Sequence, residues 1–430
     1  MDASRRVVNA DVLVEGNRIK KVGQAIRPSG RPAVLDCRGL VVLPGLIQAH
    51  IHLCQTLFRG LADDLSLEAW LAQRIWPLEA AHTEASIHAS AMLGAAELLL
   101  GGTTAILDME TVRHTAAAFE ALESIGIRAT AGKCLMDSPT SPASLRESTD
   151  AALTESADLC AKWHGAAGGR LRYCFAPRFA PSCTGPLLRA VSDLAEKSGA
   201  MMHTHAAETP LELDTVRRET GHDEIAYLDS VGISGPRAAL AHCVWMDKDD
   251  IAVLARQRTN IVHCPSSNLK LGSGIAPIPE MLAAGCRVGI GADGAPCNNR
   301  LDAFAEMRLA ALIQKPRLGP DALPAAQALE LATLGGARAL GLEAEIGSVE
   351  VGKCADLIVL DLEGPHAQPD EADLVSRIVY SARAADVRHV IVDGRVVVRD
   401  GVLKAANVAE IRRTANREAK GLRAKALDRL

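Results

Sequence analysis

The chain alternates between short apolar segments and longer amphipathic segments over most of its length. Apolar runs of strand length recur eight times, at Leu46–His52, Thr103–Met109, Arg128–Leu135, Leu171–Pro177, Ala200–Ala206, Ala238–Val244, Asn260–Pro265 and Arg287–Ala292. Apolar residues at helical spacing lie between them, for example at Glu84–Leu100, Thr115–Ile125, Pro186–Lys197, Lys248–Arg256 and Pro279–Ala284. Eight strand–helix repeats predict an α/β protein with a (β/α)8 barrel of the TIM type. The periodicity alone also fits an open parallel sheet.

The two ends of the chain share a different pattern, in which short strands are separated by tight turns. We expect strands at Ala10–Glu15, Arg18–Val22, Ala33–Asp36, Asp356–Asp361, Val387–Val392 and Arg395–Val398. Two terminal β segments that flank a long insert are able to pair with each other. We therefore predict a small β-sandwich domain from residues 1–43 and 350–403, the barrel from residues 44–349, and a helical extension over residues 404–430.

Composition narrows the class of protein. A length of 430 residues fits a barrel of about 250 residues with appended elements. Hydrophobic residues make up 48% and charged residues 23% of the chain, as in a soluble globular enzyme. The net charge of −5 argues against a nucleic-acid partner, and no apolar run reaches the roughly 18–20 residues of a membrane span. The 11 cysteines form no CxxC pair and no secretory signal is evident, so we expect a cytoplasmic protein.

Histidines and carboxylates gather where the predicted barrel strands end, which is where barrel enzymes place their sites. The first strand ends in His50-Ile51-His52, and residues two apart in a strand face the same side. Imidazole nitrogens suit zinc and iron. Taken alone, this pair fits core or surface histidines as well as metal ligands.

Three further strand ends carry the same residue types. They are His203-Thr204-His205-Ala206-Ala207-Glu208, Ala241-His242-Cys243 and Gly291-Ala292-Asp293-Gly294. Ionised aspartate and histidine avoid burial unless they have a partner, and a shared metal ion is the simplest partner for all of them. Because His203 and His205 lie on the same side of their strand, the spacing leaves either one as the ligand.

These motifs resemble the amidohydrolase superfamily. Pro44-Gly45-Leu46-Ile47 with the following His50-Ile51-His52 looks like its opening signature, and the segment from His203 to Glu208 is similar to its strand-five motif. Ala241-His242-Cys243, the segment Pro265–Gly274 and Gly291-Ala292-Asp293-Gly294 complete the set. The resemblance runs from about Asn9 to Leu403. It is closest to the branch that holds guanine deaminase, the adenosylhomocysteine and deoxyadenosine deaminases and the triazine hydrolases.

The resemblance implies one divalent metal ion, zinc or alternatively iron, bound by His50, His52, His205 and Asp293. Asp293 would also accept the proton of the attacking water, Glu208 would shuttle protons to the substrate, and His242 would polarise the water or the tetrahedral intermediate. These three residues are the expected catalytic groups.

Binuclear branches of the superfamily use a carboxylated lysine on strand four. The predicted fourth strand, Leu171–Pro177, has no lysine, and Lys133 lies on strand three. We therefore expect a mononuclear site. His263, near Asn268, is a candidate either for the pocket lining or for packing.

The substrate signals are mixed. Gln55, together with Arg178 and Phe179 after strand four, resembles the base-binding residues of guanine deaminase. Glu68 and Trp70 resemble instead a loop of the adenosine-type deaminases, in which the Glu is associated with ribose hydroxyls and the Trp with the pocket wall. Those enzymes carry a histidine where this chain has Arg178. A surface ion pair for Arg178 and an ordinary helix start for Glu68 and Trp70 are the alternatives, and His242 is expected to face the substrate as well.

The pattern as a whole predicts an aminohydrolase, acting on non-peptide C–N bonds in cyclic amidines. Its substrate would be a small purine-like heterocycle, either a 5′-modified adenosine or a guanine-type base, which loses ammonia to metal-bound hydroxide. One alternative is a triazine-type hydrolase that releases chloride or an alkylamine, and a second is a non-catalytic metal-binding barrel. The resemblance also implies a homo-oligomer. Relatives commonly have a further strand upstream, so we expect the N-terminal sheet to have a bare edge or a neighbouring subunit that covers it.

Overall fold

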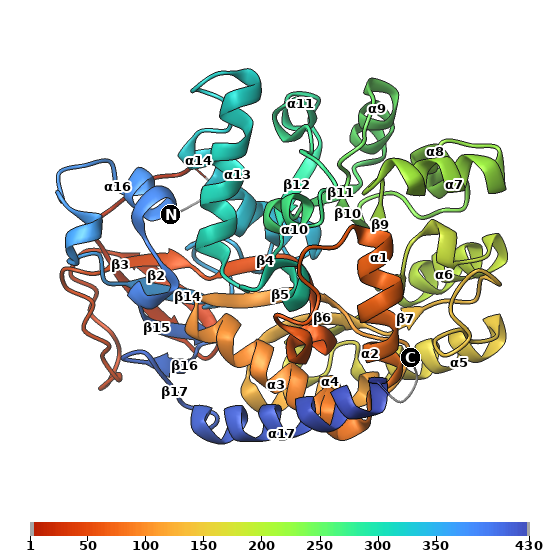
Figure 1. The fold of residues 1–430 in the computed structure, drawn as a ribbon. Helices are drawn as coiled ribbons and strands as arrows, with labels where there is room; N and C mark the ends of the chain where they lie inside the picture. The colour runs from red at the N-terminus through yellow and green to blue at the C-terminus, as the bar shows by residue number, and fades with distance from the viewer. Residues whose placement is uncertain (1–3, 428–430) are drawn as a thin grey trace.

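The computed structural model describes residues 4–427 of the chain, and most of them surround one parallel barrel (Figure 1). Its strands lie in the order β12-β11-β10-β9-β8-β6-β5-β4-β13. They are β4 (Leu46–His52), β5 (Thr103–Met109), β6 (Arg128–Gly132), β8 (Leu171–Pro177), β9 (Met201–Ala206), β10 (Ala238–His242), β11 (Asn260–His263), β12 (Arg287–Ile290) and β13 (Asp293–Gly294). Because β13 follows directly on β12 and pairs in parallel with β4, the sheet closes. The TIM-type barrel predicted from the sequence is confirmed.

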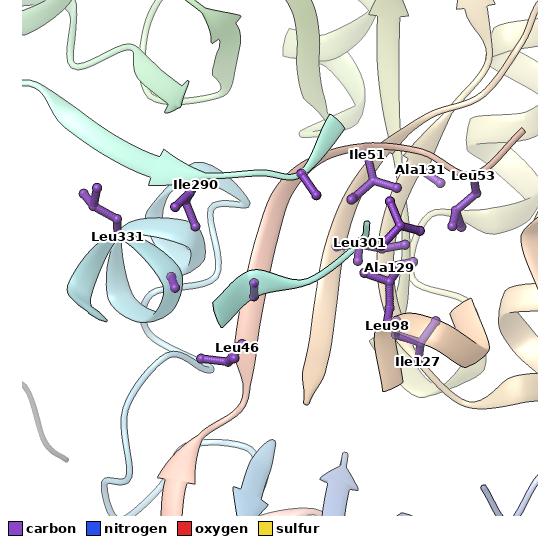
Figure 2. Close-up of a cluster of buried hydrophobic side chains, with 14 of the residues drawn as sticks. Leu46, Ile51, Leu53, Leu98, Ile127, Ala129, Ala131, Ile290, Leu301 and Leu331 are labelled. Carbon is purple, nitrogen blue, oxygen red and sulfur yellow. The ribbon is translucent and has the colours of Figure 1, made fainter. Parts of the chain in front are cut away.

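Helices cover the outside of the barrel, as the helical spacing of apolar residues predicts. They include α3 (Glu84–Leu100), α4 (Thr115–Ile125), α5 (Thr149–Trp163), α6 (Gly185–Ser198), α7 (Pro210–Thr220), α8 (Glu224–Ser230), α9 (Lys248–Gln257), α11 (Ile278–Ala283) and α13 (Ala303–Leu318). The strands are buried on both faces and their core is aliphatic. Figure 2 shows part of it, where Leu46 and Ile51 of β4 and Ala129 of β6 belong to one cluster with Leu98 of α3.

One predicted barrel strand is interrupted. The run Arg128–Leu135 forms β6 and then a separate two-residue strand, β7 (Cys134–Leu135). A Cβ on Gly132 would lie 2.0 Å from the carbonyl oxygen of Cys174, so only glycine fits against β8 at this point. The side chain of Lys133 is fully buried and pairs with Glu147, 2.7 Å away. The apolar pattern alone contains no sign of this break.

Both ends of the chain contribute to antiparallel sheets beside the barrel. A five-stranded sheet has the order β17-β16-β15-β14-β3, where β3 comes from the N-terminal part and the others from the C-terminal part. Its strands are β3 (Val41–Pro44), β14 (Leu357–Leu360), β15 (Val387–Val392), β16 (Arg395–Arg399) and β17 (Val402–Leu403). The strand predicted at Ala33–Asp36 is wrong, because that segment has no regular structure and the chain enters the sheet only at Val41.

A hairpin of β1 (Asp11–Glu15) and β2 (Arg18–Gly23) forms the second sheet. Ile19 of β2 packs with Val349, Ala355 and Leu357 in an apolar cluster that joins the hairpin to the larger sheet. Within residues 4–427, β1 pairs with β2 alone, and residues 4–10 form no strand. The expected bare edge, or its cover by a neighbouring subunit, stays a prediction.

The C-terminal helix α17 (Val408–Leu427) runs beside α3 along one edge of the barrel (Figure 1). Ala415, Leu422 and Ala426 on its inner face are buried in a cluster that also contains Phe58 and Trp70. The C-terminal extension therefore packs against residues close to the barrel mouth. No helix within the described part of the chain is long and apolar enough to cross a membrane.

Candidate active site

Four side chains converge at the carboxyl end of the barrel. His50 and His52 lie on β4, His205 on β9 and Asp293 on β13. One possible ligand atom of each lies within 4.8 Å of those of the other three. Nε2 of His50 and Nε2 of His52 each lie 3.2 Å from Oδ1 of Asp293. Three imidazoles and one carboxylate are a donor set that suits a divalent transition metal with an open coordination position.

The other ring nitrogens of these histidines are held by the surrounding chain. Nδ1 of His52 donates to the carbonyl oxygen of Met109 at 2.8 Å, and Nδ1 of His205 donates to that of Arg178 at 2.5 Å. Such contacts direct each Nε2 lone pair toward the cluster. Nε2 of His50 is buried without a hydrogen-bond partner in the described structure. An unpartnered buried nitrogen costs free energy, and a metal ion in the cluster would satisfy it.

His203, the other histidine of the strand-five motif, lies behind the cluster. Its Nε2 is 2.8 Å from Nδ1 of His50, and its ring is fully buried. The strand spacing left His203 and His205 as equal candidates, and the structure brings His205 to Asp293 while His203 supports His50 from the side remote from Asp293.

Glu208 and His242 face the cluster from the ends of β9 and β10. Oε2 of Glu208 lies 3.5 Å from Nε2 of His242, and that nitrogen lies 3.9 Å from Oδ2 of Asp293. Nδ1 of His242 donates to the amide oxygen of Asn268 at 2.8 Å. The hydroxyl of Ser273 donates to Oε1 of Glu208 at 3.1 Å. The imidazole and the carboxylate thus both have fixed orientations.

Burial and charge shift the pKa values of these groups in different directions. Burial raises the pKa of Glu208 to about 7, against the lowering effect of His242. Burial also tends to raise the pKa of Asp293, but the close approach of the His50 and His52 imidazoles to its Oδ1 outweighs it and keeps that pKa well below its usual range. Two carboxyl groups beside each other with such different proton affinities are suited to separate roles in proton transfer.

The backbone at the site is strained. Ala207, His242, Cys243 and Asp293 all have left-handed φ angles, of 51°, 72°, 46° and 62°. Such angles cost non-glycine residues of the order of 1–3 kcal/mol each and concentrate at functional sites. Here they turn the chain at three strand ends so that side chains point at one another.

A cavity opens onto this group. Its described lining comprises His52, Gln55, Leu67, Trp70, Leu71, Arg178, Phe179, His205, Glu208, Glu212, His242, Leu271 and Asp293. Most of the residues that the sequence singled out therefore meet in one place. His263 is fully buried and is not part of this lining.

Gln55 and Arg178 are joined through Glu79, a residue to which the sequence motifs gave no role. Both Nη atoms of Arg178 donate to the buried carboxylate of Glu79, at 2.7 and 3.2 Å. The amide nitrogen of Gln55 donates to the same carboxylate at 2.9 Å. The Gln55 amide oxygen is left without a partner in the described structure. Gln55 and Arg178, which both line the cavity, are therefore held by one buried carboxylate behind it.

Glu68 lies at the rim of the same cavity. Its neighbours Leu67 and Trp70 line the cavity, while Glu68 itself is exposed. Oε1 of Glu68 accepts a hydrogen bond from the hydroxyl of Thr209 at 3.3 Å, which leaves Oε2 available to a ligand. Trp70 is buried, and its ring forms part of the wall.

Two buried carboxyl groups beneath Glu208 were also missed. Oε2 of Glu212 accepts the backbone N–H of Glu208 at 2.7 Å, and Oε2 of Glu224 accepts that of Ala207 at 3.0 Å. Burial raises the pKa of both groups. Spacing along the chain reveals none of this, because it depends on how α7 and α8 fold back under the loop.

The comparisons with known proteins agree with this geometry. Residues 41–397 match the model of the amidohydrolase family. The chain belongs to the amidohydrolase family. Among curated relatives, a 5′-deoxyadenosine deaminase of Methanothermobacter thermautotrophicus is 41% identical over 414 residues, which cover 95% of both chains.

Two solved structures extend the comparison of this amidohydrolase. An adenosine deaminase from Xanthomonas campestris with bound zinc superposes with a TM-score of 0.89 at 32% identity, over 97% of this chain and 94% of that one. An atrazine chlorohydrolase from Arthrobacter aurescens in complex with zinc superposes with a TM-score of 0.92 at 26% identity, over 97% of both chains. The resemblance inferred from the motifs is thereby confirmed for the family.

Proposed function

We propose that this amidohydrolase is a zinc-dependent aminohydrolase that removes the 6-amino group of a 5′-modified adenosine as ammonia. The observation that carries the proposal is the meeting of the four-residue metal cluster, Glu208 and His242 in one cavity with the Trp70 wall. The 41% identity to a 5′-deoxyadenosine deaminase supports the same substrate class.

His50, His52, His205 and Asp293 would hold the metal. A divalent ion in such a site lowers the pKa of water to about 7 and supplies a nucleophile at neutral pH. Glu208 starts protonated with the first proton of the attacking water and would deliver it to a ring nitrogen. Asp293, whose carboxylate stays ionised, would then accept the second proton, from the hydroxyl group added to the attacked carbon. Glu208 would pass that proton to the departing amino group, so that one water supplies both protons and ammonia leaves. His242 presents Nε2 toward the same carbon and stabilises the charge that develops there.

The adenosine-type substrate is favoured over guanine because the charge of Arg178 is already met by the buried carboxylate of Glu79, which accepts one N–H from each Nη atom. A guanidinium paired in this way is a weaker partner for the lactam edge of a guanine-type base than an unpaired one. Glu68 at the rim retains a free carboxylate oxygen and suits a pair of ribose hydroxyls. We therefore assign the heterocycle to the inner cavity and the sugar to the rim.

Replacing Glu68 with glutamine tests that assignment. A hydrogen bond to a charged group contributes about 1.5–3 kcal/mol, so kcat/KM for 5′-deoxyadenosine should fall by about 10- to 100-fold, measured as released ammonia. The 2′,3′-dideoxy analogue should show little change. Glu84→Gln, an exposed glutamate at the start of α3, is the control. Equal losses of kcat/KM on both substrates would show that Glu68 does not bind the ribose hydroxyls. The deaminase proposal would still stand.

The pH profile provides a second test. As proposed, the reaction starts from protonated Glu208, so kcat/KM should fall as the pH rises through about 7. The Ser273 hydroxyl stabilises the ionised form of Glu208, and its removal raises that pKa. In Ser273→Ala, the fall of kcat/KM at alkaline pH should therefore occur at a pH about one unit higher. Ser141→Ala, which removes a buried hydroxyl that donates to the carbonyl oxygen of Ser182 at 3.2 Å, serves as the control. A pH profile that stays in place or shifts to lower pH in Ser273→Ala would contradict the assigned role.

The triazine-type hydrolase is retained as the second candidate because of the atrazine chlorohydrolase structure. Offering the zinc-loaded protein 5′-deoxyadenosine, guanine and a chlorotriazine separates the two candidates by their leaving group. Ammonia from the nucleoside supports our proposal, and chloride release without ammonia supports the alternative. Elemental analysis of the purified protein checks our choice of zinc over iron, which the zinc-bound adenosine deaminase supports. The homo-oligomer and the cytoplasmic location stay predictions.

A further inference from the structure

A buried glutamate outside the cavity connects two loops that carry the site. Glu306 lies in the first turn of α13 and is 1% exposed. Its Oε2 accepts the backbone N–H of Ser266 at 3.2 Å, and its Oε1 accepts the Ser266 hydroxyl and, at 2.9 Å, the Asn298 amide. Glu306 is not part of the described cavity lining, so its three hydrogen bonds serve the loops alone.

The first loop is the segment after β11, which forms α10 (Pro265–Lys270). The two residues that follow Ser266 reach the site directly. The Ser267 hydroxyl donates to Oδ2 of Asp293 at 2.6 Å, and the Asn268 amide oxygen accepts from His242. Holding Ser266 in position therefore orients the partners of a proposed metal ligand and of a proposed catalytic histidine at once.

The second loop is the turn that carries Asp293. Asn298 ends α12 (Ala295–Asn298), and its amide also donates to the carbonyl oxygen of Ala292 at 2.8 Å. It thereby bridges the turn from the residue before Asp293 to Glu306. Since Asp293 has a φ of 62°, the turn needs such contacts to persist in this conformation.

We propose that Glu306 is a positioning residue for the metal centre, which fastens the Ser266–Asn268 loop and the Asp293 turn to α13 in the relative arrangement that ligation requires. The inference rests on the metal role proposed above for Asp293. Glu306 acts on the site only indirectly, through Ser267, Asn268 and Asn298.

The chemistry of the three donors explains why a carboxylate is needed. A carboxylate offers two acceptor oxygens, and Glu306 uses both of them. A glutamine of the same shape would turn an NH2 group toward either the Ser266 backbone N–H or the two side-chain donors. In the first case the Ser266 backbone N–H would lose its acceptor, and in the second the Asn298 amide would, so the attachment of one loop would weaken while the packing around α13 stayed nearly unchanged.

The test is the zinc affinity of Glu306→Gln, measured at pH 7 by competition with a chromophoric chelator. Loss of a group that orients metal ligands weakens metal binding by about 10- to 100-fold, and we expect that range relative to the unaltered chain. Asp302→Ala is the matched control. Asp302 caps the same helix through the N–H groups of Phe304 and Ala305, so its loss destabilises α13 without touching either loop, and zinc affinity should stay within about twofold.

The outcomes are separable. If Glu306→Gln binds zinc as tightly as Asp302→Ala does, the positioning role is overturned. If Glu306→Gln fails to fold, Asn298→Ala removes one attachment alone and should still weaken zinc binding several-fold, and an unchanged affinity in that variant overturns the proposal. An unaltered chain that binds no zinc would overturn the metal role of Asp293 instead.

Discussion

Glu208→Gln is expected to lower kcat/KM for 5′-deoxyadenosine by about a thousandfold, because a positioned general acid–base contributes of the order of 10²–10⁴ in rate. The side chain is buried, it faces His242 at 3.5 Å, and burial raises its pKa to about 7. Glutamine keeps the shape and accepts the Ser273 hydrogen bond, but it has no proton to transfer. Ammonia release from the zinc-loaded variant measures the effect.

The fold and the metal content of this variant should stay unchanged, since Glu208 is not one of the four clustered ligands. Glu330→Gln, a partly buried glutamate paired with Arg338, controls for the loss of a carboxylate elsewhere. If Glu208→Gln with zinc bound retains more than a tenth of kcat/KM, Glu208 does not transfer a proton in the reaction.

Asp356→Asn is expected to lower the free energy of unfolding by at most about 3–5 kcal/mol, the usual cost of leaving one member of a buried ion pair without its partner. The figure is an upper bound because Arg128 also pairs with Asp393, at 3.0 Å. Asp356 precedes β14 and accepts two hydrogen bonds from Arg128 of β6, at 2.6 and 3.0 Å. It also accepts the backbone N–H of Asp393 at 2.7 Å. Both side chains of the pair are almost fully buried, and the contact joins the barrel to the five-stranded sheet.

Urea unfolding of the metal-free protein measures this loss. Asp400→Asn is the matched control, because Asp400 pairs with Arg388 at the surface. Exposed pairs contribute about 0–1 kcal/mol, so the control should stay within that range. Equal effects of the two substitutions would show that the Arg128–Asp356 contact does not stabilise the junction between the two parts.

Much of the fold followed from local patterns, and particular segments show why. The strand predicted at Leu46–His52 agrees with β4 residue for residue, because an apolar run of this length, closed by turns, has few other solutions. The segment Ala33–Asp36 also contains apolar residues, but it forms no strand. Pairing with β14 decides which N-terminal segment enters the sheet, and Val41–Pro44 makes that contact.

Within the site, too, local patterns identified some residues, and others depended on distant partners. His50, His52 and Asp293 were identified from the types of residue at strand ends, since the carboxyl ends of parallel barrel strands meet on one face. Glu79 and Glu306 carried no comparable signal. Each is a glutamate in a helix, and its importance comes from partners 99 and 40 residues away along the chain.

The sequence by itself determined the barrel, the family and the donor types at the metal cluster. These depend on strand alternation and on residues next to one another in the chain, and both are local properties. Strand spacing left His203 and His205 open and only the family resemblance preferred His205, which the structure places beside Asp293. Only the tertiary structure decided that Glu79 accepts a hydrogen bond from each Nη atom of Arg178 and that Glu306 binds two loops. Those outcomes depend on the depth of each side chain in the barrel and on competition among distant groups for the same hydrogen bonds, which are settled only when the elements pack.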